Sequence, residues 1–241
     1  MTRSQLIATQ ALTSGLIVEM ASRAINKCPY SIRELLLSSK NEQSFSGLLG
    51  SELALYPTLA LGNSSSDPSG FVLLELKGKD YIRRTEEGKK KSRNYHDLTI
   101  VDKDGEIDLI IENKFWYHFD GCKGKNNSKP EKGIKKQLEG DIFKIKQTLT
   151  EEDSGKKGFI LINVVTPGNP ELIPSSYLSE HRKVWHRTSG DIVRYRREGL
   201  DGVLSVVEKY SKDLHSISVE GIGGGPNEGF IDFICAQVVL N

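Results

Sequence analysis

The chain has 241 residues, enough for one α/β domain with a sizeable core, or for one domain and a small appendage. Charged residues make up 27% of it, and 33 Lys and Arg nearly balance 32 Asp and Glu, so net charge favours no class of partner. Its three cysteines, Cys28, Cys122 and Cys235, form no C-x-x-C pair, which argues against a disulfide framework or a zinc knuckle. This cysteine usage indicates a reducing compartment.

The first 40 residues are predicted to form a helical layer. Apolar residues recur with near-helical spacing from Leu6 to Ile25, and a shorter helical pattern follows around Leu35. Glu19 and Arg23 interrupt the first pattern, so no apolar run approaches the roughly 20 residues that a membrane span requires. We therefore interpret the segment as helices of a cytoplasmic protein that has no contact with a membrane.

From residue 41 onward the pattern passes from a helical to a strand-like period. A helix is predicted over residues 41–61, with Pro57 as a candidate earlier end. The runs FVLLEL, YIRRT, DLTIV and EIDLIIENKFW follow, separated by charged segments, and their short apolar or alternating patterns predict consecutive strands. The Asp104-Gly105 step between the last two runs favours a tight hairpin, so these two strands are expected to pair antiparallel.

Helical spacing returns in EKGIKKQLEGDIFKIKQTL at residues 131–149, and a strand, KKGFILINVVT, comes next. A strand, a helix and another strand in this order predict a right-handed crossover within one sheet. Further on we expect a strand at VWHRTS, one or two helices in residues 191–214, a flexible turn at GIGGGPNEG and an apolar tail, FIDFICAQVVL. The tail exceeds what one core is expected to bury, and it therefore favours a homodimer.

Together these elements predict an α/β fold in which a central mixed sheet of about five strands is flanked by helices. Residues 41–170 would form its core, and residues 1–40 would form the helical layer. Residues 171–241 would be an extension of the same domain, serving to bind DNA or to form the dimer.

Three charged residues on two predicted neighbouring strands form the candidate active site of the sequence. Glu112 and Lys114 follow the apolar stretch 107–111 and lie two residues apart, so both side chains project from the same face of the strand. Asp97 opens the preceding strand, and the predicted hairpin brings its carboxylate toward that of Glu112. Two converging carboxylates suit Mg²⁺, which takes hard oxygen ligands, and a neighbouring Lys can orient water or neutralise charge on a phosphate.

His96-Asp97 and Glu112-Asn113-Lys114 resemble the second and third motifs of the PD-(D/E)XK nuclease superfamily, whose members share a restriction-endonuclease-like core. The resemblance spans about half of the chain, and IIENK has the form typical of the third motif. His96 stands where the family usually has Pro. The resemblance implies Mg²⁺-dependent hydrolysis of DNA phosphodiester bonds, with Mn²⁺ as a substitute metal, metal binding by Asp97 and Glu112, and a catalytic role for Lys114.

The same resemblance implies two further residues of the site. The family often takes a metal ligand from a preceding helix, and Glu42 in NEQSFSGLL fits that pattern, with Glu52 in the same helix as its rival. Glu42 is favoured, since a glutamate in the middle of a helix is often paired with a nearby basic residue. The family also frequently places a catalytic Gln on the helix after the third motif. Gln137 matches that position, although an ordinary exposed polar residue fits it equally well.

Basic residues gather on both sides of the predicted site, where they would bind DNA phosphates, although a Lys-rich solvated loop is the commoner meaning of any single run. The residues predicted to bind DNA are Lys89, Lys90, Lys91, Arg93, Lys135 and Lys136. A restriction-type endonuclease is the first hypothesis, because the sequence contains no evident helicase, ATPase or methyltransferase part. A repair or recombination nuclease is the first alternative, and a DNA-binding module that keeps the fold without cutting is the second. A protein-interaction domain that uses the apolar tail for assembly is the third.

Overall fold

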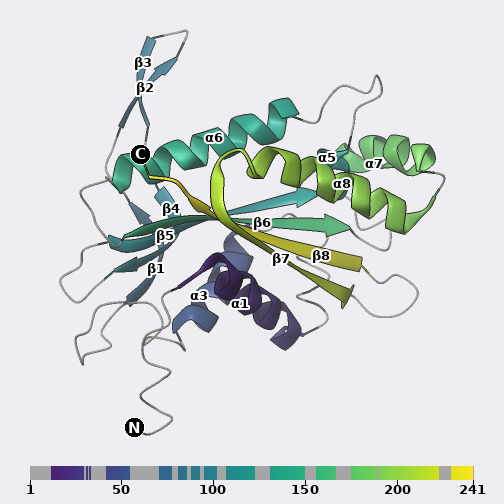
Figure 1. The fold of residues 1–241 in the computed structure, drawn as a ribbon, viewed down its shortest axis with the longest axis horizontal. Helices are drawn as coiled ribbons and strands as arrows, with labels where there is room; N and C mark the ends of the chain where they lie inside the picture. The colour runs from purple at the N-terminus through teal and green to yellow at the C-terminus, as the bar shows by residue number, and fades with distance from the viewer. Residues whose placement is uncertain are drawn as a thin grey trace, which may run out of the picture.

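The computed structural model places helices on both faces of one central sheet (Figure 1). The residues described are 12–29, 31, 33, 42–54, 71–77, 81–85, 88–92, 95–101, 107–122, 131–149, 156–166, 175–188, 190–222 and 229–240. Several predicted features lie outside them, namely the start of the N-terminal helical pattern, the pattern around Leu35, the Asp104-Gly105 turn and Arg93.

Six strands form the central sheet. Their spatial order is β1 (Phe71–Lys77), β4 (Tyr95–Val101), β5 (Ile107–Tyr117), β6 (Lys157–Thr166), β8 (Gly229–Val238) and β7 (Ser211–Ile222). β5 and β6 run parallel, whereas the other neighbours pair antiparallel. The predicted α/β fold with a mixed sheet between helices is therefore confirmed, as is the antiparallel pairing of β4 with β5. The sheet has six strands rather than about five because the C-terminal part of the chain contributes two.

Helices cover both faces of the sheet. On one face lie α1 (Ser14–Lys27) and α3 (Glu42–Ala54), and on the other lie α6 (Glu131–Thr148) and α8 (Ile192–Val207) (Figure 1). Each face has its own apolar core, and successive residues of β5 point alternately into the two. Because β5 is covered on both sides, its polar residues are buried at the points where they interrupt the apolar run.

The C-terminal part of the chain departs from the sequence-based expectation. VWHRTS was predicted as a strand, but its first four residues end the helix α7 (Ser175–Arg187). A run this short has no period of its own. Leu178 and His181 upstream, together with Val184 in the run itself, show the helical spacing to which it belongs. The predicted helical segment 191–214 is also partly wrong, since it contains α8 and then the start of β7.

The apolar tail is β8, an inner strand of the sheet that pairs with β6 on one side and β7 on the other. Residues 231–236 are buried in a single chain. The tail therefore gives no support to a homodimer, because the surface that motivated that prediction is already covered. A dimer stays a prediction without this argument.

A second, two-stranded sheet projects from the first as a separate ribbon (Figure 1). It consists of β2 (Tyr81–Thr85) and β3 (Gly88–Ser92), which pair antiparallel. The sequence EEGKKKSRN was interpreted as a segment that separates strands, and β3 within it is a correction to that interpretation. Lys lowers strand propensity, so a run of three gives little local signal for a strand.

A short helix, α5 (His118–Gly121), packs against α8 through glycines. A Cβ atom at Gly199 would lie 2.3 Å from the carbonyl oxygen of His118, and one at Gly202 would lie 1.7 Å from that of Gly121. Real side chains do not approach a backbone this closely, so the two helices can sit at this distance only where both positions lack a side chain.

A buried polar network fixes this helix pair to the sheet. The Asp232 carboxylate on β8 accepts two hydrogen bonds from the Arg196 guanidinium, at 2.9 and 2.7 Å, and lies 2.8 Å from His118 Nε2. The Ser218 hydroxyl also donates to it. Burial alone would raise the pKa of Asp232, but these partners hold it well below its ordinary value.

Gly202→Ala should lower the free energy of unfolding by about 2–4 kcal/mol, because the new methyl group must push α8 away from α5. Gly140→Ala on α6 is the matched control, since a Cβ atom there meets nothing within 4 Å. It should stabilise the protein by about 1 kcal/mol through helix propensity. Urea unfolding followed by circular dichroism measures both, and equal effects of the two substitutions would contradict the close approach of the helices.

Asp232→Asn should lower the free energy of unfolding by about 3 kcal/mol at pH 7, since Arg196 loses its buried partner. The folded-state pKa of Asp232 is depressed, so its contribution is complete above the unfolded value of roughly 4 and fades as the pH falls toward the folded value. The gap between wild type and variant should accordingly be smaller at pH 3 than at pH 7. Asp201→Asn, at an exposed position of α8, should change the stability little at either pH.

Candidate active site at the point where β4 and β5 separate

The central feature of the site is the end of the pairing between β4 and β5. The two strands are paired from Val101 and Ile107 to Leu98 and Ile111, but β5 continues to Tyr117. Beyond the paired part, β5 keeps β6 on its other side and lacks β4 as a neighbour. Its backbone N–H groups on the open side must find other acceptors.

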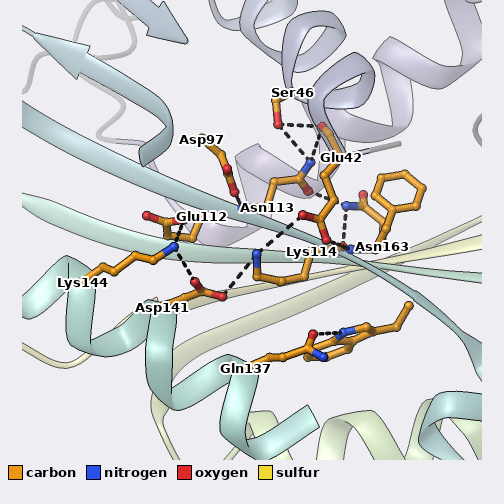
Figure 2. Close-up of polar contacts among 12 residues, drawn as sticks. Glu42, Ser46, Asp97, Glu112, Asn113, Lys114, Gln137, Asp141, Lys144 and Asn163 are labelled. Atoms are coloured by element: carbon orange, nitrogen blue, oxygen red, sulfur yellow. Dashed lines mark hydrogen bonds and ion pairs between the residues drawn. The ribbon is translucent and has the colours of Figure 1, made fainter. Parts of the chain in front are cut away.

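Two carboxylates supply these acceptors. Asp97 Oδ2 accepts from the backbone N–H of Asn113 at 2.7 Å, and Glu42 Oε1 accepts from that of Phe115 at 3.1 Å. Asp97 lies on β4, one residue before the part of that strand that pairs with β5, and Glu42 begins α3. The open edge of β5 therefore draws together residues far apart in sequence (Figure 2). Asp97 thus lies against the backbone of β5 at Asn113, between Glu112 and Lys114.

Glu112 and Lys114 project from the same face of β5, and this face is covered by α6 (Figure 2). Lys114 Nζ lies 3.3 Å from Asp141 Oδ2 and 3.7 Å from Glu42 Oε2. Glu112 Oε2 lies 3.6 Å from Lys144 Nζ, which is also 2.9 Å from Asp141 Oδ1. Carboxylates and ammonium groups therefore alternate in one chain of contacts across the site.

Glu112 is completely buried. Its Oε1 lies 2.6 Å from His96 Nδ1, and His96 Nε2 lies 2.8 Å from the hydroxyl of Thr148, so with Glu112 ionised the imidazole donates from Nδ1. Burial raises the pKa of Glu112, although the hydrogen bond from His96 and the charge of Lys144 oppose this. His96, the residue before Asp97, thus contacts Glu112 directly.

Both lysines of the site are held as ammonium ions. Burial alone would lower the pKa of Lys114, but the carboxylates around it, Asp141 first among them, raise it above its ordinary value. The pKa of Lys144 is also raised. Burial alone would lower it, but the charge of Glu112, followed by that of Asp141, outweighs this effect. Lys114 can therefore donate hydrogen bonds and neutralise negative charge, and as an ammonium ion it cannot accept a proton.

The two candidate helix carboxylates have different positions. Glu52 is buried, and both of its oxygens lie 2.8 Å from Lys27 Nζ on α1, so it faces the helical layer. Glu42 reaches Lys114 and the open edge of β5. The structure therefore brings Glu42 into the cluster and leaves Glu52 in an ion pair between α1 and α3.

The remaining predicted residues lie farther from the centre. Gln137 accepts a hydrogen bond from the indole of Trp116 at 3.0 Å, on the same face of β5 as Lys114. Lys135 and Lys136 are exposed on α6, and Lys135 lies 3.7 Å from Glu139. Lys89, Lys90 and Lys91 belong to β3 of the projecting ribbon.

Sequence reasoning missed Asp141 and Lys144. Together with Gln137 and Thr148 they follow a spacing of four, three and four residues, which places them along one stripe of α6 facing β4 and β5. This stripe was the available signal, but it runs beside the apolar stripe of the helix and so resembles an ordinary polar border. Two asparagines were also missed. Asn163 donates to the carbonyl oxygen of Lys114 at 2.9 Å and to the side chain of Asn113.

The donors of the site can be tested against a divalent metal. Glu112 Oε2 and Asp141 Oδ2 are buried and have no hydrogen-bond donor among the described residues, with only lysine ammonium groups nearby. The site has a formal charge of −2, which a dication would balance. This is the sum of four carboxylates and two ammonium groups, those of Asp97, Glu112, Glu42, Asp141, Lys114 and Lys144. However, no group of three or more His, Cys, Asp or Glu side chains in the described part of the chain is already arranged to hold a metal. The oxygen chemistry fits Mg²⁺, and binding would require the lysines to move.

Comparison of the chain with protein-family models, with curated proteins and with solved structures found no match. None of the helices described here is long and apolar enough to cross a membrane.

Lys144→Met should lower the free energy of unfolding by about 2 kcal/mol or more, because it leaves the carboxylates of Glu112 and Asp141 buried without their shared cation. Lys135→Met is the control, because its exposed pair with Glu139 contributes well under about 1 kcal/mol. Thermal and urea unfolding of both variants measure the difference. If Lys144→Met proved as stable as the control, the buried charge chain would not be a stabilising feature.

Proposed function

We propose that the chain is a Mg²⁺-dependent endodeoxyribonuclease of the PD-(D/E)XK type, most simply a restriction-type enzyme. The observation that carries this proposal is the placement of Asp97, Glu112 and Lys114 around the point where β5 separates from β4. A structural ion-pair cluster would need neither an open strand edge nor two buried carboxylate oxygens that lack donors. Both features suit a site in which a further cation is bound.

Each residue of the site has a role that its contacts support. Asp97, Glu112 and Glu42 would hold the metal, and Mn²⁺ would substitute for Mg²⁺. The bound metal would polarise a phosphate and lower the pKa of a water molecule. Lys114, held as an ammonium ion, would donate hydrogen bonds to the attacking water and to the phosphate on which negative charge develops. Gln137 would help to position the DNA backbone beside it.

DNA is the proposed partner, bound through Lys89, Lys90, Lys91 and Arg93 near the ribbon and through Lys135 and Lys136 on α6. A repair or recombination nuclease would use the same residues and differ in its substrate. A homodimer would let the enzyme cut both strands of a duplex, and light scattering with and without DNA measures it. The alternative from a different functional class is a module that binds DNA without cutting it. The cleavage experiment below distinguishes this module from an enzyme.

Lys114→Ala should abolish Mg²⁺-dependent plasmid cleavage, with a loss of about a hundredfold or more in rate, and it should leave most DNA affinity intact. Removing a group that acts on the developing charge affects the rate more than binding. Lys146→Ala, at a partly exposed position of the neighbouring helix α6 and outside the proposed DNA-binding residues, is the matched control and should keep its activity. Wild-type protein with EDTA in place of Mg²⁺ should cut nothing.

Asp97→Ala should instead weaken Mn²⁺ binding, which calorimetry measures without any DNA. Unchanged cleavage by purified Lys114→Ala would assign the activity to other residues or to a contaminant. Wild-type protein that binds DNA and cuts neither plasmid, linear nor single-stranded substrate would favour the binding module.

A further inference from the structure

The positive charge of the chain is concentrated in one short segment. Residues 77–93 hold eight basic and three acidic residues, a formal charge of +5. The whole chain carries +1, so the remaining residues together carry −4. The segment contains the whole β2–β3 ribbon, which projects away from the sheet (Figure 1). A cationic projection on an otherwise acidic body is suited to contact a polyanion.

The register of the ribbon sets like charges against each other. Arg83 is the cross-strand partner of Lys90, and Arg84 is the partner of Lys89. Like charges directly opposite one another destabilise a strand pair, and a two-stranded ribbon is at best marginally stable by itself. Since successive residues of a strand alternate between its faces, one cationic pair falls on each face of the ribbon. Both faces would gain stability if an anionic surface lay around them.

The ribbon is connected to the sheet beside the candidate active site. It follows the end of β1 at Lys77 and precedes the start of β4 at Tyr95, and these two residues are cross-strand partners. Asp97 lies only two residues beyond Tyr95 along β4. A polyanion held by the ribbon is therefore held at the end of the sheet where the carboxylates gather.

From this charge, register and position we infer that the β2–β3 ribbon is a duplex-binding arm that enters the major groove of DNA. A two-stranded ribbon has the width that this groove admits, and phosphates of both strands then line its two cationic faces. The inference deepens the proposed function by naming duplex DNA as the substrate class. The binding itself does not require that the site cuts.

The test is a double variant, Lys89→Glu with Lys90→Glu, studied in EDTA with a fluorescent 30-base-pair duplex. Each new carboxylate stands opposite an arginine, so repulsion across the ribbon becomes attraction and the melting temperature should stay unchanged or rise. Duplex affinity should fall. In a plot of the logarithm of the binding constant against the logarithm of the salt concentration, the magnitude of the slope should decrease by about two, because each lost phosphate contact removes roughly 0.9. The control is Arg182→Glu with Lys183→Glu, which makes the same charge change on exposed positions of α7.

Unchanged duplex affinity and salt slope in the ribbon variant, or an equal loss in the control, would overturn the inference. An equal loss of affinity for a single-stranded 30-mer would contradict binding in the major groove. A lower melting temperature of the variant would contradict repulsion between the like charges across the ribbon. A wild-type protein that binds duplex DNA through the ribbon but cuts nothing with Mg²⁺ would contradict the proposed nuclease activity. The duplex-binding role of the ribbon would still hold. The two proposals can therefore fail separately.

Discussion

The site depends on one constraint, which is that β5 extends beyond its hydrogen-bonding partner β4. An unpaired backbone N–H at this depth is costly, so the positions of Asn113 and Phe115 require acceptors from elsewhere in the chain. Asp97 and Glu42 meet this need, and each uses only one of its two oxygens to do so. The other oxygen of Glu42 lies 3.7 Å from Lys114 Nζ. The backbone of β5 thus brings acidic groups together without any metal having to organise them.

Gathering carboxylates in a buried place has an electrostatic consequence, because their mutual repulsion must be offset. Asp141 adds a further negative charge from α6, and the ammonium groups of Lys114 and Lys144 lie between the carboxylates. Lys144 in particular sits between Glu112 and Asp141, in the place where a cation is most favourable. Lys144 thus offsets part of the repulsion between the carboxylates that β5 and α6 bring together.

The fold and the centre of the site were largely predictable because both rest on local patterns. The period of two in β5 places Glu112 and Lys114 on one face, and the two strand runs around Asp104-Gly105 are close enough in sequence to pair. Asp141 and Lys144 could not be found in this way, since their role appears only when α6 lies across β5. The same limit explains the errors at the C-terminus, where VWHRTS is too short to show its period and β8 is apolar because it is an inner strand of the sheet.

Two buried polar clusters in the molecule differ in how fully their carboxylates are hydrogen-bonded. Around Asp232 every strong acceptor is satisfied, since Arg196, His118 and Ser218 converge on one carboxylate and depress its pKa. Around Glu112 the pKa is raised, and one oxygen of the carboxylate lacks a donor although no part of the side chain reaches solvent. A protein gains nothing in stability from leaving such an atom unsatisfied. The second cluster therefore retains capacity for one more positive group, and it lies at the end of the sheet from which the cationic ribbon projects.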